Sequence, residues 1–203
     1  SRLFVGRARG GELSKVSSIQ DAFARATEIE SRITRYSVLS GALGAFPIPG
    51  LAIATDLAVI ALQLKMISDI GGFFGHKVDR QAAKSLLYGV GLGTGARLAV
   101  NNIAKLLPGW GSVVGATTSF ASTFALGKVI EKLFASGDPS ATEALRTEFK
   151  AAEAVARSVY ADQKDVIIQS QRANKSAFDA LTADLKAGKI TQDEFDAKVA
   201  ELA

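Results

Sequence analysis

Cysteine is absent from the 203-residue chain, and His76 is its single histidine. The absence of thiols excludes a disulfide framework, a thiolate metal site and a cysteine nucleophile. One imidazole cannot form a His-based metal cluster, and the position of His76 beside Lys77 and Asp79 predicts a loop residue. We therefore expect no metal and no cofactor.

Proline and aromatic residues are also scarce, with four prolines and an aromatic share of 7%. The hydrophobic 48% is mostly Ala, Leu, Val and Ile, which favours helices and one main domain with an appendage. Proteins that bind single-stranded nucleic acid need aromatic stacking platforms, and the basic residues here are scattered singly. We expect no nucleic-acid partner.

Net charge is unevenly distributed along the chain. Residues 1–35 carry +3 (seven basic, four acidic), residues 36–135 carry +4 (eight basic, four acidic) and residues 136–203 carry −3 (nine basic, twelve acidic). The positive charge therefore accompanies the apolar half of the chain. This combination suits an anionic membrane surface.

The sequence GALGAFPIPGLAIATDLAVIALQL is an apolar stretch with one acidic residue, Asp56. An amphipathic helix is predicted before it, from Glu12 to Tyr36. Pro47, Pro49 and Gly50 interrupt the stretch, so one helix should end before the first proline and another should start at the second. Each arm would be roughly 16–22 Å long, shorter than the ~30 Å hydrocarbon core of a bilayer. The stretch predicts a helical hairpin with an apolar tip.

A second helix–Pro-Gly–helix unit occurs at Pro108 and Gly109, and its second arm is uncharged up to Lys128. The sequence thus predicts an all-α fold with two apolar hairpins, an N-terminal amphipathic helix and a C-terminal helical extension. The predicted divisions are residues 1–35, 36–135 and 136–175, followed by a short helical hairpin over 176–203.

The acidic last third contains its own helix signals. Asp138 is predicted as an N-cap, Gly188 as a helix stop, and Thr191 with Glu194 as a capping box. Because this region is amphipathic and separately capped, we expect it to lie outside the apolar core and to contact a neighbouring subunit or partner. A weak heptad seam is formed by Leu145, Phe149, Ala152, Ala156 and Val159.

Several glycines match a dinucleotide-binding fingerprint around Gly91, but no clear strand precedes them and no acidic residue follows until Glu131. Their spacing instead favours close helix packing, which we expect to mediate self-association. Without a catalytic constellation, the chain is not expected to be an enzyme. The glycines expected to pack closely are Gly89, Gly91, Gly93, Gly95, Gly111 and Gly115.

Asp56 is an acidic residue within the first apolar hairpin, seven residues before Gln63, so the two side chains can share one helical face. A carboxylate in that setting needs a partner, and Arg97 and Lys105 are the available cations. We expect an interhelical pair or a water-facing position, with an ion or proton pathway as the alternative.

The segments PIPGLAIATDLAVIALQLKMISDIGGFFG and LLPGWGSVVGATTSFASTFALGKVIEKLF lie within residues 37–134. Their Pro-x-Pro-Gly turn, Gln63, Met66, Gly75, second Pro-Gly and final Leu-Gly resemble the bacterial family catalogued as domain of unknown function 697. This resemblance implies membrane association and a link to P-loop GTPases. The motif GxxxxGK[ST] is absent, so nucleotide hydrolysis would belong to a partner.

The C-terminal hairpin has a second resemblance. Gly188, Ile190, Thr191, Glu194 and Phe195 are similar to the signature of the short C-terminal domain found in bacterial membrane and stress proteins. That resemblance implies a role in assembly or regulation.

Two functions remain open. The first is a non-enzymatic, membrane-associated scaffold that forms homo-oligomers on the cytoplasmic side of a bacterial inner membrane with a GTPase or membrane-stress partner. The second is a soluble, cytoplasmic helical module whose hairpins form an ordinary core and which docks onto a P-loop GTPase. If the first function is correct, the residues that contact the membrane should all lie on one side of the molecule. They are Trp110 and the cations Arg32, Arg35, Lys65, Lys84 and Lys128.

Overall fold

The computed structural model of the chain describes residues 5–45, 52–92, 115–137 and 142–203. Over these ranges the chain forms six helices and no strand, which confirms the all-α prediction. The predicted turn residues Pro47, Pro49, Gly50, Pro108 and Gly109 lie outside the described ranges. The helices are α1 (Val5–Gly44), α2 (Ala52–Phe73), α3 (Arg80–Leu92), α5 (Ala116–Ser136), α6 (Thr142–Lys186) and α7 (Gln192–Glu201).

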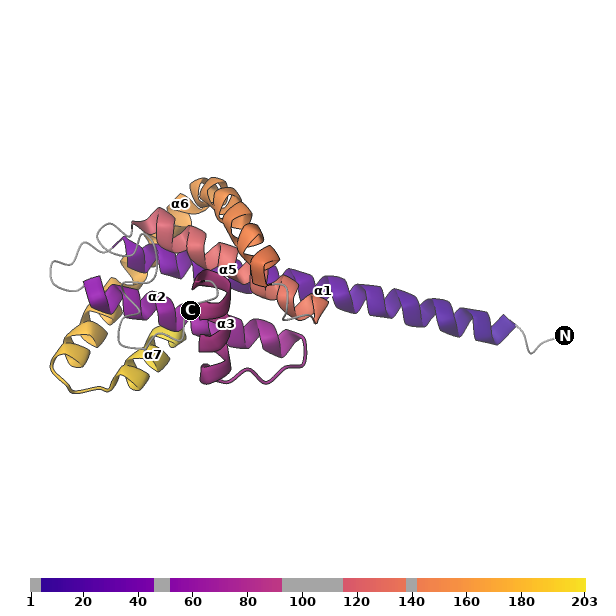
Figure 1. The fold of residues 1–203 in the computed structure, drawn as a ribbon, viewed down its shortest axis with the longest axis horizontal. Helices are drawn as coiled ribbons and strands as arrows, with labels where there is room; N and C mark the ends of the chain where they lie inside the picture. The colour runs from indigo at the N-terminus through magenta and orange to yellow at the C-terminus, as the bar shows by residue number, and fades with distance from the viewer. Residues whose placement is uncertain (1–4, 46–51, 93–114, 138–141) are drawn as a thin grey trace.

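Helix α1 is a single helix of 40 residues that continues through residue 35, where the sequence suggested a division. Its N-terminal half projects beyond the other helices, and its C-terminal half lies among them (Figure 1). Within the bundle, Ile29, Ile33, Tyr36 and Leu43 follow the three- and four-residue steps of one helical face, and all four are buried. This face forms one wall of the core.

Helices α2 and α5 pack against α1 and supply most of the remaining core. In α2, Leu62, Met66 and Ile70 are fully buried, and in α5 so are Phe120 and Ile130. Both helices are apolar around most of their circumference, which is typical of helices enclosed by other elements. The apolar side chains of α2 and α5 are therefore buried against other helices of the same chain.

Local signals explain where the helices begin and end. Helix α3 begins after Asp79, whose Oδ1 accepts a hydrogen bond of 2.8 Å from the backbone N–H of Ala82. At the other end of the chain, Gly188 has φ +68° just after α6, and Thr191 and Glu194 form a reciprocal capping box at the start of α7. The helix stop and the capping box predicted from sequence are confirmed.

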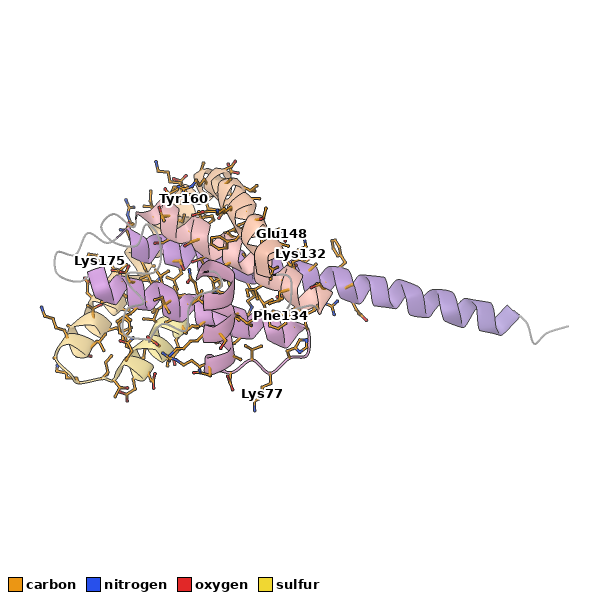
Figure 2. The ribbon with its side chains drawn as sticks, viewed as in Figure 1. Lys77, Lys132, Phe134, Glu148, Tyr160 and Lys175 are labelled. Atoms are coloured by element: carbon orange, nitrogen blue, oxygen red, sulfur yellow. The ribbon has the colours of Figure 1, made fainter. Side chains whose placement is uncertain are left out.

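The 45-residue helix α6 bends over the bundle and carries α7 to the opposite side, next to α2 (Figure 1). The Tyr160 ring on α6 meets Phe120 of α5 edge-on, with 5.7 Å between ring centroids. Lys132 of α5 pairs with Glu148 of α6 (Figure 2). These contacts fix α6 on the outer side of α5.

The prediction that residues 136–203 lie outside the apolar core is wrong for the described part of that region. Leu145 and Ala156, both from the predicted heptad seam, are buried in the main cluster together with Phe178 and Phe195. The region is acidic overall, but most of its charged side chains are exposed or half-buried, Asp196 being buried, while α6 packs against α5 and α7 packs against α2. Net charge therefore did not indicate where the helices pack.

Close packing of α1 on α5 generates a prediction for Gly127. A Cβ at this position would lie 2.7 Å from Cγ1 of the fully buried Ile33, so Gly127→Ala should lower the free energy of unfolding by roughly 1–3 kcal/mol. Gly72→Ala is the control, because a Cβ there meets nothing within 4 Å and alanine should stabilise the helix by about 0.5–1 kcal/mol. Denaturant titrations measure both, and an unchanged midpoint for Gly127→Ala would contradict the packing.

Candidate functional site

Among the described residues, none of the helices combines the length and apolar character needed to cross a bilayer. Within the same ranges, no group of three His, Cys, Asp or Glu side chains is placed to hold a metal ion. His76 lies in the exposed loop between α2 and α3, as predicted, and stacks on Phe134 with 5.3 Å between ring centroids. Its role in the described structure is to pack the loop against the end of α5.

Of the glycines selected from the sequence, the described structure tests close packing only at Gly115. Gly115 is the N-cap of α5, and a Cβ there would meet nothing within 4 Å, so close packing at this position is not found within the described chain. Instead, a Cβ on Gly44 would lie 2.8 Å from the Cβ of Ser119. Of the other predicted glycines, Gly89 and Gly91 lie in α3, while Gly93, Gly95 and Gly111 lie outside the described residues.

The cations predicted to meet lipid headgroups are largely engaged within the chain. Arg32 lies 3.7 Å from the Asp69 carboxylate on α2, and Lys65 also pairs with Asp69. Lys128 of α5 pairs with Glu30 of α1. These pairs lie on two flanks of α1, one facing α2 and the other facing α5, rather than on one side.

The remaining membrane candidates have other positions. Arg35 lines a groove between α1 and α6, and Lys84 is half-buried on α3. Trp110 lies outside the described residues.

Asp69 also fixes the register of α1 against α2. The hydroxyl of Tyr36, a residue 3% exposed, donates a hydrogen bond of 2.7 Å to Oδ2 of Asp69. Burial, followed by the hydrogen bond to Asp69, raises the pKa of Tyr36 well above its usual range. The phenol therefore remains protonated and continues to donate at any physiological pH.

Gln63 and Asp56 have separate environments although they share α2. Gln63 is buried, and its Nε2 donates a hydrogen bond of 3.1 Å to Oγ1 of Thr123 on α5. Asp56 is half-buried, and no hydrogen bond or ion pair reaches it from the described residues; Arg97, its expected partner, lies outside them. Burial raises the pKa of Asp56 from 3.8 to about 6.

A polar contact that sequence reasoning missed holds α7 in place. Arg80, at the start of α3, lies 3.1 Å from Asp193 through its Nη1 and pairs with Asp196 through its Nη2. Gln192 also donates a 2.5 Å hydrogen bond to Asp196. Burial raises the pKa of Asp196, and the contacts from Gln192 and Arg80 oppose this rise. We call Arg80, Gln192, Asp193 and Asp196 the α7 clasp.

Next to the clasp, a groove of about 180 Å³ lies between α2 and α7. Small side chains form much of its lining, including Ala61 and Ser68 of α2 and Ala197 and Ala200 of α7. A larger groove of about 450 Å³ lies between α1, α6 and the last residues of the chain, and its apolar lining includes the buried Val38 and Leu39 and the exposed Val166. The candidate functional surfaces are these two grooves and the α7 clasp.

Comparison with models of protein families, with curated proteins and with solved structures finds no match to this chain. The functional argument therefore depends on the geometry of the helices. In that geometry the polar groups tie helices to one another, through Tyr36 to Asp69, Gln63 to Thr123 and Arg80 to Asp196.

Asp56 provides a prediction for the pH dependence of stability. Because its folded-state pKa of about 6 lies above the ordinary 3.8, the folded chain holds this proton more tightly than the unfolded chain. The stabilising contribution is fully present below pH 3.8 and is lost as the pH rises through 6. Asp56→Asn should therefore raise the melting temperature at pH 7.5 more than at pH 4.

Thermal melts at both pH values measure this effect. Asp162→Asn, which removes an exposed carboxylate of α6, is the matched control and should change the melting temperature little at either pH. An equal shift for Asp56→Asn at both pH values would show that burial of the charge is not the cause.

The clasp provides another prediction. Arg80→Ala removes the cation from Asp196, a residue 8% exposed, and should lower the free energy of unfolding by roughly 1–3 kcal/mol. Hydrogen exchange of the α7 amides should accelerate more than that of α5. Asp193→Asn is the control, because this carboxylate is 84% exposed. It should change the free energy of unfolding by less than about 1 kcal/mol. Equal acceleration in α5 and α7 would contradict a local role for the clasp.

Proposed function

We propose that the chain is a non-enzymatic helical interaction module that self-assembles and docks onto a P-loop GTPase. The observation that favours an interaction module over a membrane scaffold is the burial of both apolar helices within the chain. Leu62, Met66 and Ile67 of α2 and Phe120 and Leu126 of α5 have 0–2% of their surface exposed. Side chains enclosed in this way contribute to folding and leave little of these helices for a bilayer to cover.

The distribution of exposed groups supports the module over the membrane scaffold. Among the described residues, the exposed large hydrophobic side chains are Phe23 on α1 and Val155 and Val166 on α6, and none is on α2 or α5. Arg32, Lys65 and Lys128 already have carboxylate partners. Transfer of these cations to anionic headgroups would exchange one ion pair for another and gain little.

The GTPase part of the proposal does not come from the geometry of the helices. It rests on the resemblance of residues 37–134 to domain of unknown function 697, which implies a link to P-loop GTPases and which no family-model match supports for this chain. The chain has no phosphate-binding GxxxxGK[ST] loop, so in this proposal the nucleotide belongs entirely to the partner. The chain contributes the surfaces of helices that already pack against one another. A surface formed before binding loses less conformational entropy than one that folds on binding, which favours a docking role.

Flotation with vesicles distinguishes the module from the membrane scaffold. The chain, purified without detergent, is mixed with vesicles of anionic or of zwitterionic lipid and centrifuged through a density gradient. We expect it to stay at the bottom with both. Flotation with anionic vesicles that is lost in Arg35→Glu or Lys84→Glu, the two candidate cations without a described ion pair, would favour the membrane scaffold.

The GTPase part of the proposal has its own test. P-loop GTPases are purified from the organism that produces this chain, loaded with GDP or with a non-hydrolysable GTP analogue, and titrated with the chain. We expect at least one of them to bind with an affinity that depends on the nucleotide. Failure of all of them to bind would remove the GTPase from the proposal.

A further inference from the structure

We propose that α7 is exchangeable, so that the position it occupies on α2 also accepts α7 from a second copy of this chain. This inference rests on the self-assembly in the proposed function and names its contact. The position is defined by α2, the start of α3 and the end of α6, and α7 packs against α2 and α6. We call it the α7 seat.

Helix α7 depends on the seat for its own stability. It has ten residues, and isolated helices of that length are unstable in water even with good caps. Its two main anchors, Phe195 and Val199, are fully buried. The Phe195 ring lies 6.3 Å from that of Phe178 on α6, centroid to centroid. If α7 leaves, the apolar surface between it and the seat is exposed to water unless another helix binds there.

The chemistry of the seat specifies what that cover must be. A helix that replaces α7 needs apolar residues four positions apart, as at Phe195 and Val199, and acidic residues beside them for Arg80. The α7 of a second copy meets these requirements because it carries the same residues. Arg80 then selects the acidic face through the charge complementarity already present within one chain.

Helix α7 has fewer neighbours than the central helices, because it packs against α2 and α6 whereas α5 packs against α1, α2, α3 and α6. The groove of about 180 Å³ lies along its contact with α2, lined by Ala61, Ala197 and Ala200 among others. By contrast, α1 approaches α5 so closely that a Cβ on Gly127 would overlap Ile33. Fewer helices pack against α7 than against α5, so separation at α7 loses fewer dispersion contacts than separation at α5. We therefore expect α7 to detach while the rest of the bundle stays folded.

The connection between α6 and α7 is short and closes at a glycine. Gly188 has φ +68°, and its N–H donates a 3.1 Å hydrogen bond to the Leu185 carbonyl. Opening this turn swings α7 away from its own seat and towards that of a neighbour. Because the contacts in the seat are the same in both arrangements, exchange is limited by the turn and by the entropy of association, and it increases with concentration.

The absence of cysteine makes a disulfide test direct. Ala61→Cys is placed in one chain and Ala200→Cys in another, since both positions line the same groove. After incubation at high protein concentration and oxidation, we expect a disulfide-linked heterodimer on a non-reducing gel. Lys198→Cys replaces Ala200→Cys in the matched control, because Lys198 is exposed on α7 and is not part of the groove, and it should give much less heterodimer.

A single chain that carries both Ala61→Cys and Ala200→Cys shows whether the geometry permits the bond. In dilute solution it should form the bond within one chain, and Ala61→Cys with Ala197→Cys is the second pair tested. Arg80→Ala added to the mixed chains should speed heterodimer formation roughly three- to tenfold, since the clasp holds α7 closed. If neither cysteine pair forms a disulfide within one chain, α7 does not occupy the α7 seat as described and the proposal fails.

The mass of the assembly, measured by light scattering over a range of concentrations, separates this inference from the proposed function. Oligomers without the specific disulfide between chains would overturn exchange of α7 and leave self-assembly intact. A monomer at every concentration would overturn both. Oligomers with that disulfide, and little in the Lys198→Cys control, would support exchange.

Discussion

The close approach of α1 and α5 is the constraint on which the rest of the structure depends. Gly44 lies opposite Ser119 near one end of the contact, and Gly127 lies opposite Ile33 near the other, so the two helices run antiparallel. At both points the space left by a missing side chain is filled by the neighbouring helix. Because the helices cannot separate there without opening a void, α2 and α6 must pack on the surfaces that this pair presents.

Apolar packing alone would leave the helices able to slide, since it has little directional preference. Here a few buried polar contacts set the register. Tyr36 ties α1 to α2 through Asp69, and Gln63 ties α2 to α5 through Thr123. A slip of one residue would leave these groups without partners in a region of low dielectric, where an unsatisfied polar group is costly. The three central helices are therefore held in one arrangement.

Sequence patterns predicted the features that depend on neighbours along the chain. The all-α class, the helix stop at Gly188 and the capping box of Thr191 and Glu194 all follow from local chemistry, and the structure contains them. The α7 clasp joins Arg80 to Asp196 across 116 positions, and no spacing rule connects residues so far apart. An arginine at a helix start and an acidic residue beside an apolar anchor are each common alone. Only the fold brings them together.

The packing of α6 and α7 into the core, through residues such as Leu145, Phe178 and Phe195, was missed for a related reason. Net charge is a property of the whole segment, whereas packing depends on one face of each helix. Likewise, glycine spacing indicated close helix contacts in general, but the position of a contact depends on which helix lies opposite. Gly41 and Gly44, which do contact α5 closely, are three residues apart and so lack the four-residue spacing of Gly91 with Gly95 and of Gly111 with Gly115.

The continuity of α1 has a consequence for whatever contacts its projecting half. Phe23, which is 75% exposed, lies on the same helix as the buried Ile29 and Ile33, but on a different face. An α-helix turns by about 100° per residue. The direction in which Phe23 points relative to the bundle is therefore fixed by the number of residues between Phe23 and the buried Ile29. Inserting one residue in that interval would rotate the whole projecting half by about 100° without altering a single side chain on it. The interval thus acts as an angular spacer, and its length determines which side of the projecting helix a bound molecule meets.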